Sequence, residues 1–113
     1  MITENYVSFE TAKLLKEKGF DVDECEVHYD PEDHTQYDIT QQMAMKWLRE
    51  EHNLVVSVEP EINTDSELDL FYVFKIFEIK NTLTRLIYNG YELCDSYEEA
   101  CEAAIKYCLE NLV

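Results

Sequence analysis

Glycine and proline are scarce in this sequence. The 113 residues include only two glycines, Gly19 and Gly90, and two prolines, Pro31 and Pro60. The phosphate-binding P-loop and the dinucleotide-binding fingerprint each need two or three glycines within a few residues of one another, because their backbone N–H groups must approach a phosphate closely. Two isolated glycines cannot form either motif, so both nucleotide-binding motifs are excluded.

Basic residues are also scarce. Nine Lys and Arg residues stand against 25 Asp and Glu residues, which gives a net charge of −16. A protein that binds nucleic acid directly normally presents a basic stripe to the phosphates, so we expect no direct nucleic-acid binding. The acidic surface has two interpretations. It either keeps the protein in solution, or it occupies a basic, nucleic-acid-binding partner protein.

Long apolar segments are missing as well. The longest strongly apolar run, LFYVF, is far too short to span a membrane. The first ten residues, MITENYVSFE, lack the basic start and apolar run of a secretory signal. Four cysteines without such a signal are typical of reduced thiols. We therefore expect a cytoplasmic protein, either of a bacterial cell or of an infected host cell, that does not contact a membrane.

Capping residues predict three helices. Ser8 can begin the first helix, and Gly19 can end it in the left-handed conformation. Thr40 can cap a second helix that ends at Asn53. Ser96 begins a third helix through a capping box with the glutamate three residues later.

Alternating apolar residues predict strands in the remaining segments, in the order helix, short strand or hairpin, helix, three strands, helix. Runs of strands separated from helices indicate an α+β fold, with three helices packed on an antiparallel sheet of about three to five strands. A hydrophobic content of 46% is typical of one globular domain, here residues 1–113. The segments predicted to form strands are ECEVHYD, LVVSVEPEI, LFYVFKIFEIK and TRLIY, and in the hairpin alternative TQYDI pairs back on ECEVHYD as a second short strand.

The segment LFYVFKIFEIK has apolar side chains on both faces, which favours a central position in the sheet. If the helices cover only one face, the aromatic residues of the other face form an exposed patch of the kind that marks a partner or dimer surface. The alternative is that both faces are covered. Our candidate interaction surface combines one face of this strand with the acidic segment between residues 21 and 38, and consists of Tyr72, Phe74, Ile76, Asp30, Glu32 and Asp33.

Three cysteines, Cys94, Cys101 and Cys108, follow one another at intervals of seven residues in CDSYEEACEAAIKYC. Seven helical residues separate Cys101 from Cys108 by roughly 10.5 Å, too far for a disulfide or for one zinc ion to join them. We expect these two thiols to lie on the buried face of the third helix, and Cys94 to be the most reactive.

A metal site is the alternative to a pure interaction protein. Cys25, His28 and His34, with nearby carboxylates, have spacings that match no paired zinc pattern. No Cys-His or Ser-His pair is indicated, so we expect no cofactor, no resident metal and no catalytic residue. The alternative hypothesis is a small metal-dependent enzyme or metal-binding protein that uses His28, His34 and nearby carboxylates.

Three segments, YVSFETAKLLKEKGFD, TQQMAMKWLREEHN and SYEEACEAAIKYCLENL, resemble a family of small uncharacterised proteins from gut bacteria and their phages. The resemblance covers the three predicted helices. It implies a phage or mobile-element origin and an intracellular location, and it carries over no site residue. Our functional hypothesis is therefore a protein-binding accessory factor that binds a basic protein partner and forms a homodimer.

Overall fold

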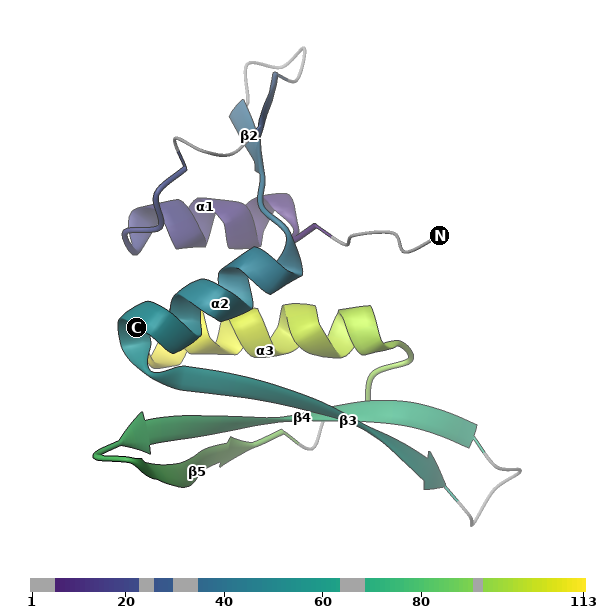
Figure 1. Cartoon of the computed structure of the whole chain (residues 1–113). Helices are drawn as coiled ribbons and strands as arrows, with labels where there is room; N and C mark the ends of the chain where they lie inside the picture. Colours follow the sequence, from purple (N-terminus) through teal and green to yellow (C-terminus); the bar gives the residue numbers. More distant parts are fainter. Residues whose placement is uncertain (1–5, 23–25, 30–34, 64–68, 91–92) are drawn as a thin grey trace.

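The computed structural model describes residues 6–22, 26–29, 35–63, 69–90 and 93–113 (Figure 1). It confirms the predicted α+β fold. The helices and strands, in chain order, are α1 (Phe9–Glu17), β1 (Glu26–Tyr29), β2 (Thr35–Asp38), α2 (Gln41–His52), β3 (Leu54–Asn63), β4 (Asp69–Lys80), β5 (Leu83–Asn89) and α3 (Tyr97–Asn111).

The helix ends are set by the predicted capping residues. The side chains of Ser8, Thr40 and Ser96 each accept a hydrogen bond from the backbone N–H three residues later. These bonds satisfy N–H groups that have no partner inside the helix. Asn53 ends α2 in the left-handed conformation, with a φ of 57°, and Gly19 follows α1 with a φ of 106°. Local chemistry therefore fixes where all three helices begin and where α1 and α2 end.

The main sheet is an antiparallel meander in the order β3-β4-β5, so β4 is central as predicted. Val56 of β3 lies opposite Ile76, and Val58 lies opposite Phe74. Between β4 and β5 the register shifts by a bulge at Ile76/Phe77. β1 and β2 form a separate antiparallel hairpin, which confirms the pairing expected for TQYDI.

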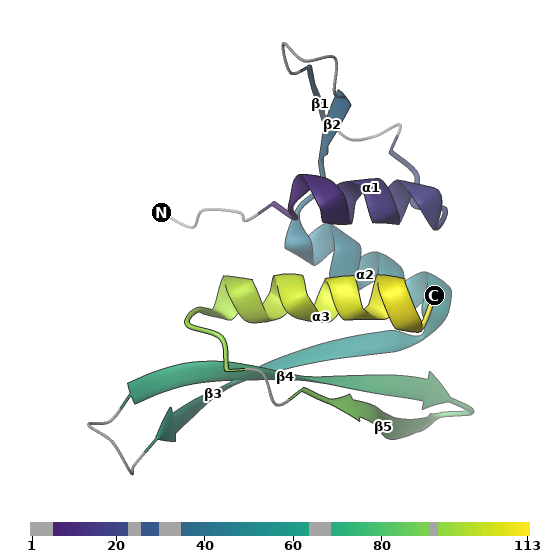
Figure 2. The ribbon, with the colours of Figure 1, turned by 180° about the vertical axis from the view of Figure 1, so that it is seen from behind.

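The molecule has three layers (Figures 1 and 2). α2 and α3 lie on one face of the β3-β4-β5 sheet, and α1 lies beyond them, where it contacts α3 and β2. The hairpin of β1 and β2 projects past α1. No described helix lies on the opposite face of the sheet. The sequence left open whether one face or both faces of the sheet are covered. In the described part of the chain, helices cover only one face.

The core lies between the sheet and α3. The buried residues of α3 recur at helical spacing and are Ala100, Cys101, Ala104, Ile105, Cys108 and Leu109. This confirms the predicted burial of Cys101 and Cys108. Cys94 is also buried, with 8% of its surface exposed, because its backbone pairs with that of Tyr72 in both directions.

A polar contact joins α1 to α3. One carboxylate oxygen of Glu102 accepts a hydrogen bond of 2.7 Å from the Thr11 hydroxyl and one of 3.0 Å from the Ser8 N–H. Thr11 is completely buried, so this bond satisfies a hydroxyl that would otherwise cost free energy on burial. A carboxylate at the N-terminus of α1 also interacts favourably with the helix dipole. The contact fixes α1 on the outer side of α3.

Stacked aromatic rings fill the space between α3 and the sheet. The Tyr88 ring lies 3.8 Å from that of Tyr107 and 5.7 Å from that of Phe74, measured between ring centroids. The backbone of Gly90 lies against Phe74, so a Cβ atom at this position would be only 2.9 Å from the ring. Gly90 is therefore required by close packing, whereas Gly19 has open space around it and is required by its positive φ.

We predict that Gly90→Ala lowers the free energy of unfolding by about 1–3 kcal/mol, because the new methyl group displaces the Phe74 ring. Gly19→Ala should cost about 1 kcal/mol through backbone strain alone. Urea unfolding measures both changes. Adding Phe74→Leu should partly compensate Gly90→Ala and not Gly19→Ala; strictly additive effects at Gly90 and Phe74 would contradict this packing.

Alkaline pH should destabilise the fold through its buried thiols. Burial raises the pKa of Cys101 to about 11 and that of Cys108 to about 12, from an ordinary value of 9.0. Above pH 9 the unfolded chain releases these protons while the folded chain keeps them, so the free energy of unfolding falls as pH rises. We expect a loss of about 1–2 kcal/mol per thiol between pH 8 and pH 10.5. The same titration of Cys108→Ala is the control, and a slope equal to that of the wild type would refute the assignment.

Candidate interaction surface

No described helix covers one face of the sheet (Figures 1 and 2), and the strand register places a group of apolar side chains on this face. Successive residues of a strand point to opposite faces, so the face turned away from the helices can be read from the strand register. We call it the open face. Its described members, from β3 through β4 to β5, are Val55, Ser57, Glu59, Glu61, Phe71, Val73, Lys75, Phe77, Ile79, Thr84, Leu86 and Asn89. Val73 is the buried member, with 7% of its surface exposed.

Phe77 lies near the middle of the open face. Val55 is its neighbour on β3, and Leu86 is its neighbour on β5. Ile79 and Leu86 are 38% and 46% exposed, whereas Val55 and Phe77 are half-buried. Apolar side chains from all three strands therefore form one contiguous patch, and contiguous exposed patches of this kind mark interaction sites more often than isolated apolar residues do.

The strand face that we predicted as an interaction surface is the wrong one. Phe74 and Ile76 are 2% and 0% exposed, because α3 packs over them. Tyr72 is half-buried, with its ring 6.2 Å from that of Tyr97. Both faces of β4 are apolar, so the sequence pattern alone could not show which of them the helices cover. The other three predicted members, Asp30, Glu32 and Asp33, lie outside the described residues.

The charges on the open face lie toward β3. Lys75, in the central strand, forms an ion pair of 3.2 Å with Glu59 of β3. Glu61 follows on the same face of β3 and is exposed. Pro60, between these two glutamates, has no N–H group to donate to a further strand. The β3 side of the open face is therefore acidic, and this edge of the sheet is poorly suited to strand pairing.

The opposite edge, β5, has a different composition. The interval between Glu78 and Glu92 contains no acidic residue and is the longest such interval in the chain. The first four residues of β5, from Leu83 to Leu86, are all exposed, and Leu83 is 73% exposed. In a chain with a net charge of −16, a strand without acidic residues repels an approaching acidic molecule less than β3 does, because β3 carries Glu59 and Glu61.

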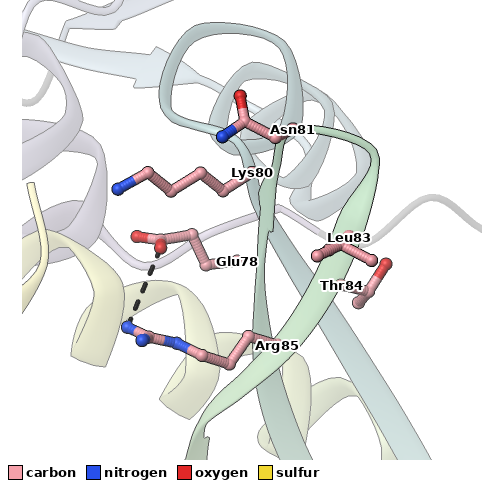
Figure 3. Close-up of a pocket in the computed structure, with 6 residues that line it drawn as sticks. All are labelled: Glu78, Lys80, Asn81, Leu83, Thr84 and Arg85. Atoms are coloured by element: carbon pink, nitrogen blue, oxygen red, sulfur yellow. Dashed lines mark ion pairs between the residues drawn. The ribbon is translucent and has the colours of Figure 1, made fainter.

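A shallow hollow of about 430 Å³ lies at the turn between β4 and β5, lined by Glu78, Lys80, Asn81, Leu83, Thr84 and Arg85 (Figure 3). The side chains of Glu78, Lys80 and Arg85 extend to the same side of the hairpin, and Arg85 forms an ion pair of 3.9 Å with Glu78. Arg85 and Lys80 are exposed, so solvent screens both charges. The hollow is an open surface of the hairpin, and we assign it no ligand.

The proposed metal ligands cannot be assembled from the described residues. Within the described ranges, no three His, Cys, Asp or Glu side chains come close enough together to hold a metal ion. Cys25 and His34 lie outside those ranges, and only the backbone of His28, on β1, is described. The metal hypothesis therefore stays a prediction that the described part of the chain does not test.

No protein-family model, curated protein or solved structure matches this chain. None of the described helices is long and apolar enough to cross a membrane. The resemblance to small proteins of gut bacteria and their phages stays a prediction. The functional argument therefore depends on the surface of the molecule alone.

Paired substitutions on β4 test which face of the sheet is covered. Ile76→Ala should lower the free energy of unfolding by about 2–5 kcal/mol, because it leaves a cavity beneath the helices. Ile79→Ala, three positions later on the open face, should cost less than about 1 kcal/mol. Chemical denaturation of the two variants measures the difference, and equal costs would mean that both faces are covered.

Proposed function

We propose that this chain is a non-enzymatic, protein-binding accessory factor, and that it binds a basic protein partner over the open face. The observation that carries the proposal is the contiguous patch around Phe77, which no described helix covers. Half-buried apolar side chains stabilise a complex when the partner removes their remaining surface from water. A binding role follows from this patch without any catalytic residue.

The chemistry of the patch defines the partner. Its centre is apolar at Phe77 and Leu86, whereas its β3 side carries Glu59 and Glu61. A complementary surface has an apolar ridge at its centre and Lys or Arg residues along one side. Arg suits the rim best, because its planar guanidinium can bind a carboxylate through two hydrogen bonds.

The overall charge supports the same partner class. A net charge of −16 produces a negative potential around the molecule, and this potential accelerates encounters with basic proteins. The apolar patch then contributes affinity after the encounter. A partner that normally binds nucleic acid would have the required charge, and the acidic surface would compete with its nucleic-acid substrate.

The setting of the proposal is the interior of a bacterial cell or of an infected host cell. The resemblance to proteins of gut bacteria and their phages favours this setting, and a phage or mobile-element origin would fit an accessory factor. A bacterial lysate is therefore the suitable source of partners. The competing interpretation is that the acidic surface only keeps the protein in solution.

The experiment compares two charge variants of equal net charge. Glu59→Gln/Glu61→Gln removes the acidic rim of the open face, and Glu50→Gln/Glu51→Gln removes two exposed acids from α2. Each double substitution changes the net charge from −16 to −14 (−16 plus 2). We expect the wild type to retain basic proteins from the lysate at about 0.05 M salt and to release them at about 0.5 M salt. The rim variant should retain them at least about threefold less than the α2 variant.

Equal losses in the two variants would indicate nonspecific ion exchange and would overturn the proposal, as would retention that does not depend on salt. The same protein treated with a chelator tests the metal alternative. A bound metal that is lost together with stability would favour a metal-dependent protein that uses His28 and His34.

A further inference from the structure

We infer that β5 is the edge through which two copies of this chain associate, by antiparallel pairing of β5 with β5 of the second copy. The open face and its basic partner concern a different surface, so this inference goes beyond the proposed function. It starts from the contrast between the two edges of the sheet. β3 carries Pro60 between two glutamates, whereas β5 contains neither a proline nor an acidic residue.

The backbone of β5 offers hydrogen-bonding groups at this edge. The N–H of Ile79 donates to the carbonyl oxygen of Asn53, so the backbone groups of Ile79 point away from β5. In an antiparallel pair of strands, two residues that lie opposite each other either both point their N–H and C=O groups toward the other strand or both point them away from it. The residue of β5 opposite Ile79 therefore points its backbone groups away from β4. Thr84 lies opposite Ile79, and Leu86 lies opposite Phe77, two residues earlier on β4. Both therefore present unpaired backbone groups at the edge of the sheet.

Exposed edges of this kind readily pair with another strand, and natural proteins usually protect them with charge, proline or a covering segment. β5 has Arg85 as its only charged residue. Its side chain points to the face opposite to that of Leu86, since the register places Arg85 across from Glu78. Among the described residues, no proline, acidic residue or covering element protects the outward backbone groups of Thr84 and Leu86.

A second copy is the occupant that the charge distribution favours. Two chains with a net charge of −16 repel each other, so contact is least unfavourable where few unpaired acidic residues lie; the acid nearest to β5, Glu78, is paired with Arg85. The interval between Glu78 and Glu92 is the longest one without an acid, and β5 lies within it. A basic foreign strand would instead meet Lys80 and Arg85 at this edge. A second copy also brings a strand of equal length.

Pairing across a two-fold axis perpendicular to the sheet joins the two sheets into one of six strands. The two open faces then lie on the same side, with Leu86 of each copy near the junction. The dimer would present a doubled apolar surface to a basic partner, with the two acidic β3 edges at its outer limits.

Salt dependence distinguishes this association from partner binding. Salt screens the repulsion between two acidic copies, so we expect the dimer dissociation constant to fall several-fold between about 0.05 M and 0.5 M NaCl. Binding of a basic partner should weaken over the same range. Sedimentation velocity of the wild-type chain measures the dimer fraction. A chain that stays monomeric at about 1 mM in all salt concentrations would overturn the inference and leave the proposed function standing.

Two variants with equal charge changes locate the contact. Leu86→Lys places a charge on the edge strand and should raise the dissociation constant at least about tenfold. Ile79→Lys places the same charge on the open face of the central strand and should change it less than about threefold. Equal weakening would indicate packing of two open faces instead of edge pairing and would overturn the assignment to β5.

Amide hydrogen exchange gives a readout that does not depend on variants. When the wild-type chain is concentrated at 0.5 M salt, the N–H groups of Thr84 and Leu86 should exchange more slowly. Exchange at Leu93, which is 65% exposed and lies outside β5, should not change. Dimer formation without protection at Thr84 and Leu86 would contradict β5 pairing.

Discussion

The buried face of α3 is the constraint on which the rest of the structure depends. Ile105 and Leu109 are fully buried in the core cluster. Glu102, on the same helix, holds the N-terminus of α1 through Thr11 and Ser8. α3 therefore contacts the sheet, α2 and α1, and it determines how the layers are stacked.

This arrangement places the helices α2 and α3 on one face of the sheet and leaves α1 in an outer layer. The stacking of Tyr88 between Phe74 and Tyr107 strengthens contact with the covered face. None of the described helices remains to cover the other face, where Phe77 and its neighbours lie. The apolar patch is thus a direct consequence of how the core is built, and the proposed binding function depends on it.

Features fixed by local chemistry could be predicted from the sequence. The caps at Ser8, Thr40 and Ser96, and the left-handed end of α2 at Asn53, depend on residues within one helical turn. The burial of Cys101 and Cys108 followed from helical periodicity, because the polar residues of α3 lie on the other side.

Features fixed by contacts between distant segments could not be predicted in the same way. Both faces of β4 are apolar, so the choice of Phe74 and Ile76 as an exposed surface was wrong. The burial of Cys94 depends on backbone pairing with Tyr72, which no local pattern indicates. The candidate edge at β5 had a signal in the sequence, namely the interval without acidic residues after Glu78. The interval indicates an association edge only together with the strand order, which places β5 at the edge of the sheet.

The proposed function depends on one face of the sheet being open to solvent. Methyl NMR of the wild-type chain with a soluble paramagnetic probe tests it directly, because the probe broadens only those methyl groups that it can approach. We expect strong broadening at Ile79 and Leu86 and little at Ile76 and Ile105. Protection of Ile79 and Leu86 equal to that of Ile76, in dilute monomeric protein, would contradict the open face and the function proposed for it.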